Sequence, residues 1–131
     1  MAIEITTDSR SDVIDITENV SEALPPDLDR GVCTLFVTHT TAGVIVNERE
    51  PRLLSDIEQL LQQLIPATEQ FEHDAIDDNA AAHLRSILLG ESVPVPVTDG
   101  KLALGTWQSI LFVESDGPRT RTVDIVCTSG I

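Results

Sequence analysis

The sequence contains almost no lysine and few basic residues of any kind. Lys101 and seven arginines stand against 22 aspartates and glutamates, which gives a net charge of −14. Such a surface repels nucleic acid and anionic membranes, because binding to nucleic acid depends on neutralising phosphates. The balance favours a protein adapted to high salt, where self-repulsion is screened; an acidic face for a basic partner is the alternative. Stability measured against salt separates the two, since a salt-adapted protein unfolds in dilute buffer.

Cysteine, long apolar runs and several common motifs are also scarce or missing. The two cysteines, Cys33 and Cys127, lack Cys-x-x-Cys spacing, so they predict reduced, buried thiols rather than a disulfide framework or zinc finger. No run of about 18 apolar residues occurs, and no membrane span is expected. The N-terminus lacks the charged and apolar regions of a signal peptide, so we expect a cytoplasmic protein. Gly-x-Gly-x-x-Gly, a Walker loop and a Ser-His-Asp nucleophile elbow are absent.

What is present is a pattern of short apolar strands. Alternating or continuous apolar runs predict strands over 3–5, 12–16, 31–39, 44–46, 93–97, 107–114 and 119–127. We expect the first two strands to pair with each other. Pro94 and Pro96 indicate that the strand over 93–97 lies at a sheet edge, and 98–101 reads as a hairpin turn.

Two main helices complete the predicted domain. Apolar residues at three- and four-residue spacing predict helices from Pro51 to Leu64 and from about Asn79 to 89, the second capped by Asp77 or Asp78. A short helix over 17–24 is also expected. The 131 residues fit a single core. We therefore predict one compact α+β domain over 1–131, β-rich and sandwich-like, with two main helices.

The chain has three histidines, and each lies in a polar, turn-rich context. His39 ends a strand on its more apolar face, His73 lies in a loop, and His83 follows Asn79 by one helical turn. Imidazole is both a common metal ligand and a proton shuttle. The three predict a zinc-type site with one open position, in which Asp74 or Asn79 orients a ligand. Ordinary hydrogen-bonded histidines near the ends of elements are the alternative.

Four other side chains are candidates from their chemistry. Glu48 can serve as a general base or carboxylate ligand, or it belongs to a charged loop. Arg119 and Arg121 share a strand face and fit phosphate oxygens, with ion pairing as the alternative. Trp107 is either core packing or a wall against which a flat ring stacks.

Several segments together resemble the YjbQ-like family. They are His39-Thr-Thr-Ala-Gly43 with Asn47-Glu48, His73-Asp74 with Asp78-Asn79 and Ala82-His83-Leu84, Leu88-Leu-Gly90 with Ser92, Asp99 through Gly-Thr-Trp-Gln108, and Asp116-Gly-Pro-Arg119-Thr-Arg121. The likeness covers nearly the whole chain, and its Gly-Thr-Trp-Gln and Asp-Gly-Pro-Arg blocks are specific. One departure is that Arg49-Glu50-Pro51 follows Asn47-Glu48, without the aspartate that the family usually carries.

The resemblance implies a β-rich α+β fold, a homotrimer, and a polar cleft that contains the motif histidines and takes a small phosphorylated metabolite. The family is named for a secondary thiamine-phosphate synthase activity, so it implies a transferase on phosphorylated thiamine precursors. A metal-dependent hydrolase of a small phosphorylated substrate and a non-catalytic metabolite-binding protein are the alternatives. A divalent metal, zinc or magnesium, is the expected cofactor.

Carried over residue by residue, the resemblance names one candidate site. The candidate catalytic residues are His39, Glu48, His73 and His83, and the three histidines are also the candidate metal ligands. The candidate substrate-binding residues are Asn47, Asn79, Trp107, Gln108, Arg119 and Arg121.

Overall fold

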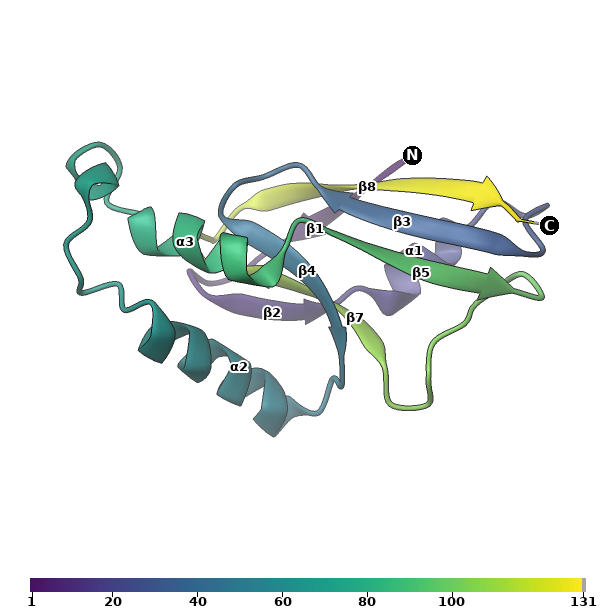
Figure 1. Ribbon diagram of the computed structural model, residues 1–131, viewed down its shortest axis with the longest axis horizontal. Coiled ribbons are helices and arrows are strands. Elements are labelled where there is room, and N and C mark those ends of the chain that lie inside the picture. The colour runs from purple at the N-terminus through teal and green to yellow at the C-terminus, as the bar shows by residue number, and fades with distance from the viewer. Residues whose placement is uncertain (131) are drawn as a thin grey trace.

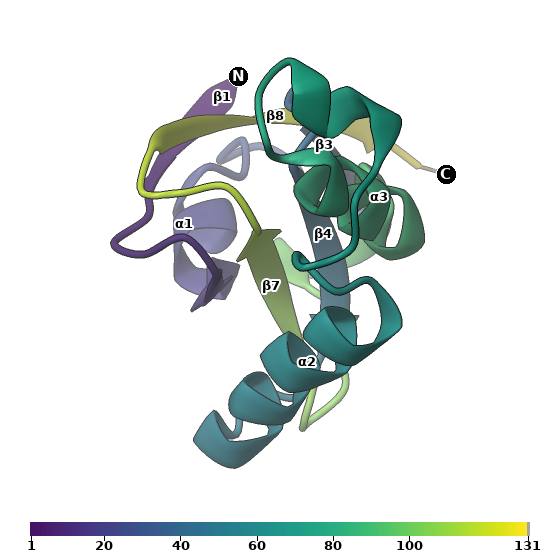
Figure 2. The same cartoon turned by 90° about the vertical axis from the view of Figure 1, so that its left-hand side faces the viewer.

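Two antiparallel sheets form the body of the protein in a computed structural model that describes residues 1–130 (Figure 1). The strands are β1 (Ala2–Thr6), β2 (Asp12–Asp15), β3 (Gly31–Val37), β4 (Ala42–Asn47), β5 (Ser92–Thr98), β6 (Lys101–Leu102), β7 (Ser109–Glu114) and β8 (Thr120–Ser129). The larger sheet has the order β1-β8-β3-β5-β6 and the smaller one the order β2-β7-β4. Figure 2 shows β8 and β3 in the layer above β4 and β7. The predicted β-rich, sandwich-like α+β fold is confirmed.

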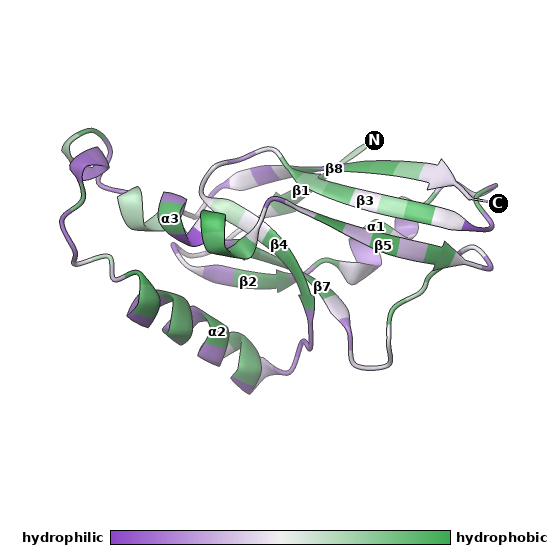
Figure 3. Ribbon diagram, in the orientation of Figure 1, coloured by the Kyte–Doolittle hydropathy of each residue, from purple (hydrophilic) through white to green (hydrophobic). Residues whose placement is uncertain are grey.

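Helices cover part of the smaller sheet and its connections. They are α1 (Thr17–Glu22), α2 (Pro51–Leu64), the 3-10 turn η1 (Glu72–Ala75) and α3 (Ala80–Leu89). α3 lies beside β4, and α2 presents an apolar side to the sheets and a polar side away from them (Figure 3). The two main helices therefore stand where their spacing predicted them. Within residues 1–130, no helix is long and apolar enough to cross a membrane.

The core lies between the two sheets and centres on β7. All six residues of β7 are buried, because it is the middle strand of the smaller sheet. Phe112 is fully buried and stands opposite Val44 on β4 and Ile14 on β2. Burial of one such side chain contributes about 1.5–3 kcal/mol. Glu114, the last residue of this strand, is also fully buried, although it carries a carboxyl group. Its partners are described with the candidate site below.

The expected pairing of the first two strands is wrong. β1 pairs with β8 in the larger sheet, whereas β2 pairs with β7 in the smaller one. The short link between them therefore crosses from one sheet to the other. Thr7 in this link donates its backbone N–H and its hydroxyl to the carbonyl of Arg119, at 2.9 Å and 3.1 Å. Alternation in a sequence shows which side chains share a face, but it does not name the neighbouring strand.

The predicted turn after β5 is confirmed, whereas its predicted edge position holds only in part, because the two-residue β6 is the outermost strand of the larger sheet. β6 covers only the end of β5, at Val97 and Thr98, so Pro94 and Pro96 lie where no outer strand needs their missing N–H groups. The hairpin turns through Asp99 and Gly100, which take φ values of 52° and 75°. Two positive φ values are the requirement of a two-residue type I′ turn.

The predicted cap of α3 and the predicted strand position of Trp107 need correction. Neither Asp77 nor Asp78 caps α3; instead, Oδ1 of Asp74 accepts the N–H of Ala80 at 2.9 Å, because η1 folds Asp74 back over the helix start. The hydrogen bonds that the Asp74 carboxylate accepts from the backbone N–H groups of Ala80 and Phe71 lower the pKa of Asp74.

β7 begins only at Ser109, so Trp107 lies in the preceding loop and not in the predicted strand. Its side chain is 74% exposed and does not belong to the core.

Candidate functional site

A buried ion pair lies where β7 ends and β8 begins. Glu114 is fully buried and pairs with the guanidinium of Arg121 through Nε, and also through Nη2 at 3.3 Å. Its Oε2 also accepts the hydroxyl of Thr41 at 3.3 Å and the backbone N–H groups of Ser115 and Asp116 at 3.0 and 2.9 Å. A buried carboxylate is tolerated only when it is paired and hydrogen-bonded in this way.

Glu114 is the site residue that sequence reasoning missed. Its signal in the sequence is a single carboxylate at the end of the apolar run Ile110-Leu-Phe-Val113, where a solvent-facing charge would normally mark the strand's end. The structure buries it because Arg121 lies on the neighbouring β8 and turns its Nε toward it. The arginine was predicted as a phosphate ligand, with ion pairing as the alternative. The ion pair is present, while binding of phosphate stays a prediction. Nη2 donates to the hydroxyl of Thr41 at 2.7 Å, and Nη1 is turned toward His39.

His39 is held in one tautomer by the backbone. Its Nε2 lies 2.8 Å from the backbone N of Thr122. A backbone N–H can only donate, so Nε2 must be the acceptor, and the neutral ring carries its proton on Nδ1. Burial lowers the pKa of His39, and the charge of Arg121 lowers it further, against smaller opposing effects of Glu114 and Thr122. The neutral ring is therefore the form that the fold favours.

Two donors consequently meet without an acceptor between them. Nδ1 of His39 lies 3.5 Å from Nη1 of Arg121, and both nitrogens carry hydrogen. Two donors cannot satisfy each other, whereas an oxyanion beside them can accept from both. Glu114 and Thr41 hold the guanidinium in place for this contact. We call this pair of facing donors the His39–Arg121 corner.

This corner opens into a polar hollow of about 330 Å³, which we call the His39–Arg121 pocket. Its lining includes five of the predicted residues, namely His39, Asn79, His83, Arg119 and Arg121, and also Thr38, Thr40, Thr41, Asp77 and Asp116. Asp116 organises one wall, since its Oδ2 accepts Nδ2 of Asn79 at 2.9 Å and contacts Nη2 of Arg119 at 3.4 Å. Arginine charge and hydroxyl groups suit an anionic ligand, and His83 adds a group that can exchange a proton.

His73 supports His83 from behind and does not line the pocket. The two rings meet edge to face, with centroids 4.7 Å apart. Nε2 of His73 and Oδ1 of Asn79 are both buried and have no hydrogen-bond partner within residues 1–130. Of the three predicted histidines, two therefore face the pocket and the third lies behind one of them.

The three histidines do not fit the predicted metal site. Nε2 of His39 is occupied by the N–H of Thr122, and its Nδ1 faces the cationic Arg121, which would repel a metal ion. In the part of the chain that the structure describes, no three His, Cys, Asp or Glu side chains are grouped so that they could hold one. The set of His39, His73 and His83 is therefore not a ligand set in this geometry. A divalent metal stays a prediction that would need other ligands.

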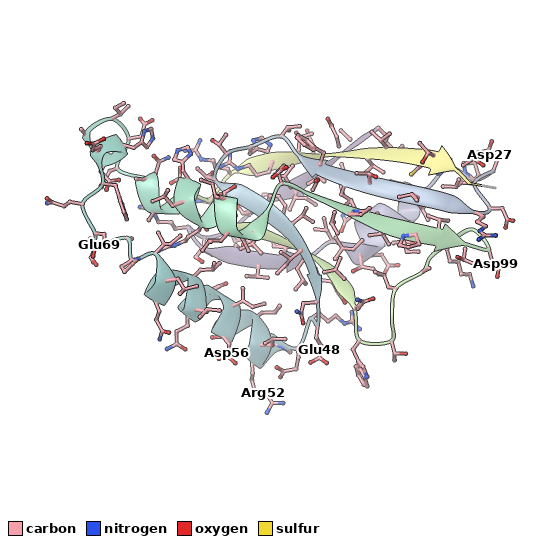
Figure 4. The ribbon with its side chains drawn as sticks, viewed as in Figure 1. Asp27, Glu48, Arg52, Asp56, Glu69 and Asp99 are labelled. Atoms are coloured by element: carbon pink, nitrogen blue, oxygen red, sulfur yellow. The ribbon has the colours of Figure 1, made fainter. Side chains whose placement is uncertain are left out.

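Four predicted residues lie at the opposite end of the β4–β7 ladder. Asn47 pairs with Ser109 in this ladder, whereas Ala42 pairs with Glu114. Six strand residues span about 17 Å, so one small ligand cannot touch both ends. The four residues, Asn47, Glu48, Trp107 and Gln108, line two neighbouring hollows of about 530 and 240 Å³ that share Glu48 and Trp107. Figure 4 shows Glu48 where β4 gives way to α2. In a single chain, the predicted site is thus divided in two.

Comparison with known proteins identifies the family. The model of the family described as UPF0047 protein YjbQ-like matches residues 1–130. The chain belongs to the YjbQ-like family. A UPF0047 protein of Archaeoglobus fulgidus is 46% identical over 123 residues, which cover 94% of this chain and 96% of that protein. The YjbQ-like relative YugU of Bacillus subtilis is 38% identical over 122 residues, with 92% of each chain covered.

Solved structures of similar sequence share the YjbQ-like fold. A hypothetical protein from Aeropyrum pernix superposes with a TM-score of 0.95 at 42% identity, covering 99% of this chain and 98% of the other. A YbjQ-like protein of unknown function from Sulfolobus solfataricus gives a TM-score of 0.95 at 36% identity, with 99% and 96% covered. The resemblance seen in the sequence motifs is therefore confirmed for family and fold.

Proposed function

We propose that the His39–Arg121 pocket binds the phosphoryl group of a small metabolite, and that the protein is a transferase acting on phosphorylated thiamine precursors. The observation that carries the proposal is the pair of facing donors, Nδ1 of His39 and Nη1 of Arg121, 3.5 Å apart. Arg119 lines the same pocket and adds a second guanidinium. Guanidinium forks match phosphate oxygens, which makes a phosphorylated ligand the best fit.

The proposed reaction needs little more than charge stabilisation and positioning. The thiazole nitrogen uses its lone pair to form a bond to the methylene carbon of the pyrimidine diphosphate. The carbon–oxygen bond breaks, and pyrophosphate leaves with the electron pair. Arg121, Arg119 and His39 stabilise the negative charge that develops on the leaving group, because fixed donors in a polar pocket need no reorganisation. His83 transfers a proton to the departing oxygen.

Purified protein incubated with the two precursors tests the proposal directly. We expect thiamine phosphate and pyrophosphate in equal amounts. Arg119→Gln should lower kcat/KM by about 10²-fold, the cost of losing one charge-stabilising donor. Arg52→Gln is the matched control, because Arg52 is an exposed arginine that pairs with Glu50 at the start of α2 and does not line the His39–Arg121 pocket. If wild-type protein forms no thiamine phosphate, the transferase assignment is wrong.

His83→Ala separates catalysis from binding. We expect this variant to keep its affinity for a phosphorylated ligand, measured calorimetrically, and to lose most of its turnover. Binding without turnover in the wild-type protein would favour a non-catalytic metabolite-binding protein. Release of inorganic phosphate together with stoichiometric metal in elemental analysis would favour a metal-dependent hydrolase instead.

A further inference from the structure

A further hollow, of about 370 Å³, also borders the chain segment that follows β7, since Ser115 lines it and Asp116 lines the His39–Arg121 pocket. It is bounded by the β1–β2 turn, the end of α2 and α3, which lie toward the viewer in Figure 2. Its polar lining residues are Arg10, Ser11, Gln62, Thr68, Arg85 and Ser115. We propose that this Arg10–Arg85 pocket is a second anion site, which binds the phosphoryl group of a small molecule independently of the His39–Arg121 pocket.

Arg85 is a buried cation without a carboxylate. It projects from α3 and is only 6% exposed. Its Nε and Nη2 donate to the carbonyl of Ile65, the residue that follows α2, at 3.0 and 2.7 Å. Within residues 1–130, it forms no salt bridge, and its Nη1 has no hydrogen-bond acceptor. A carbonyl satisfies two donors but cannot neutralise a charge, and an unpaired buried charge is costly.

Arg10 places a second cation in the same pocket. Its Nη2 donates to the carbonyl of Asp78 at 3.3 Å, and its own carbonyl accepts the N–H of Gly117 at 3.0 Å. Burial lowers the pKa of Arg85, and the charge of Arg10 lowers it further, so the two guanidiniums repel each other. Arg10 also has no carboxylate partner in the described part of the chain. An anion between the two would remove this repulsion.

The absence of acid from this lining is unusual for this protein. The chain has 22 acidic residues among 131, and four of its seven arginines pair with one of them. None of the residues that line the Arg10–Arg85 pocket is acidic, whereas Asp77 and Asp116 line the His39–Arg121 pocket. The hydroxyl groups of Ser11, Thr68 and Ser115 add donors beside the two guanidiniums. Several donors around a double positive charge match the several oxygens of a phosphoryl group.

Thermal unfolding in inorganic phosphate tests this site, with KCl used to hold the ionic strength constant. The variants are Arg10→Gln and Arg30→Gln, each made in the Arg119→Gln background to weaken the first pocket. Arg30 is an exposed arginine without a salt bridge in residues 1–130 and lies in the turn before β3, so its loss gives the same change of charge. Arg85 is left intact because it also holds the end of α2.

We expect the Arg30→Gln variant to keep its phosphate-dependent rise in Tm, and the Arg10→Gln variant to bind phosphate about tenfold more weakly or worse. Equal phosphate affinity of the two variants would overturn the proposal. So would an equal rise in Tm with acetate at the same concentration, because that would make the pocket a general carboxylate site. Loss of thiamine-phosphate synthesis in Arg119→Gln alone reports on the first pocket, so the two proposals fail separately.

Discussion

The two ends of the β4–β7 ladder carry motif residues of opposite physical character. At one end, Ala42 stands opposite Glu114, and the side chains around this carboxylate are buried and bonded to one another. At the other end, Asn47 stands opposite Ser109, and Trp107 is 74% exposed. A binding site needs side chains whose orientation is locked by their neighbours. The side chains with a fixed orientation, which include His39 and Arg121, therefore lie at the Glu114 end.

The glycines of the two ends differ in the same way. A Cβ on Gly43 would meet Cβ of Leu89 at 2.6 Å and the carbonyl oxygen of Gly90 at 2.8 Å. A Cβ on Gly105 would meet only the Gln108 side chain, at 3.2 Å from Oε1. At the Glu114 end, β4 and α3 therefore pack closely at Gly43. At the other end, Gly105 lies in a loop, and its one close neighbour is the Gln108 side chain, which can move. The first end should resist substitution, and the second should tolerate it.

The largest expected effect comes from Glu114→Ala. Removing one partner of a buried pair leaves Arg121 charged and unpaired, which costs about 3–5 kcal/mol of the free energy of unfolding. Glu48→Ala, at the other end, should change it by no more than about 0.5 kcal/mol. Urea unfolding of the two variants measures both values. Similar costs for the two substitutions would remove the distinction between the ends.

Gly43→Ala is expected to have the next largest effect. Overpacking against α3 should cost about 1–3 kcal/mol, because backbone and Cβ atoms cannot turn away as a flexible side chain does. Gly105→Ala serves as the paired control and should cost a few tenths of a kcal/mol, since Gln108 can move. Chemical denaturation of both variants checks the difference, and a Gly105→Ala cost as large as that of Gly43→Ala would contradict it.

His39 should make stability depend on pH. The pKa of His39 is lower in the folded protein than in the unfolded chain. Below about pH 6.5, the unfolded chain therefore binds a proton at this ring that the folded protein does not bind. The contribution is complete above that pH and is lost as the pH falls, by up to about 1.4 kcal/mol per pH unit. His39→Gln, which keeps an acceptor for the N–H of Thr122, should flatten this slope. Unfolding free energies at pH 7 and 5.5 test it; equal slopes would show that His39 is not responsible.

The smallest effect is expected from Trp107→Ala. The side chain is large, but its exposure means that truncation should change the free energy of unfolding by about 0.5 kcal/mol or less. Phe112→Ala, a fully buried residue on the adjoining β7, should cost about 3–5 kcal/mol by contrast. Thermal unfolding of both variants gives the comparison. A costly Trp107→Ala would mean that the exposed end is also a packed one.

Local pattern was enough to predict most elements and several site residues. Apolar spacing predicted α2 and α3, the prolines predicted the open edge of β5, and Asp99-Gly100 predicted its turn. The pocket residues His39, His83 and Arg121 were found from residue type and context. These predictions succeed because period, rotamer and turn conformation depend on neighbours in the chain.

Contacts between distant segments could not be predicted in this way. The pairing of β1 with β8 joins opposite ends of the chain, and it is the clearest example. The Asp74 cap of α3 and the ion pair that buries Glu114 join residues only six and seven positions apart, but both depend on how the chain turns between them. The motif over 39–48 predicted a single site that contains both His39 and Glu48. In the structure, β4 lies between these two residues and separates them. A strand that runs through a motif separates its ends by its own length.

The sequence by itself determined the elements, the apolar faces and the family, because each depends on the order of side chains along the chain. Only the tertiary structure decided which charges share a buried pocket. Glu114 orients Arg121 across two strands, and the Thr122 backbone selects the His39 tautomer. Arg10 and Arg85, 75 positions apart, come to line one pocket free of acidic side chains. The electrostatic interaction between two charged side chains depends on the distance between them, and the fold alone sets that distance.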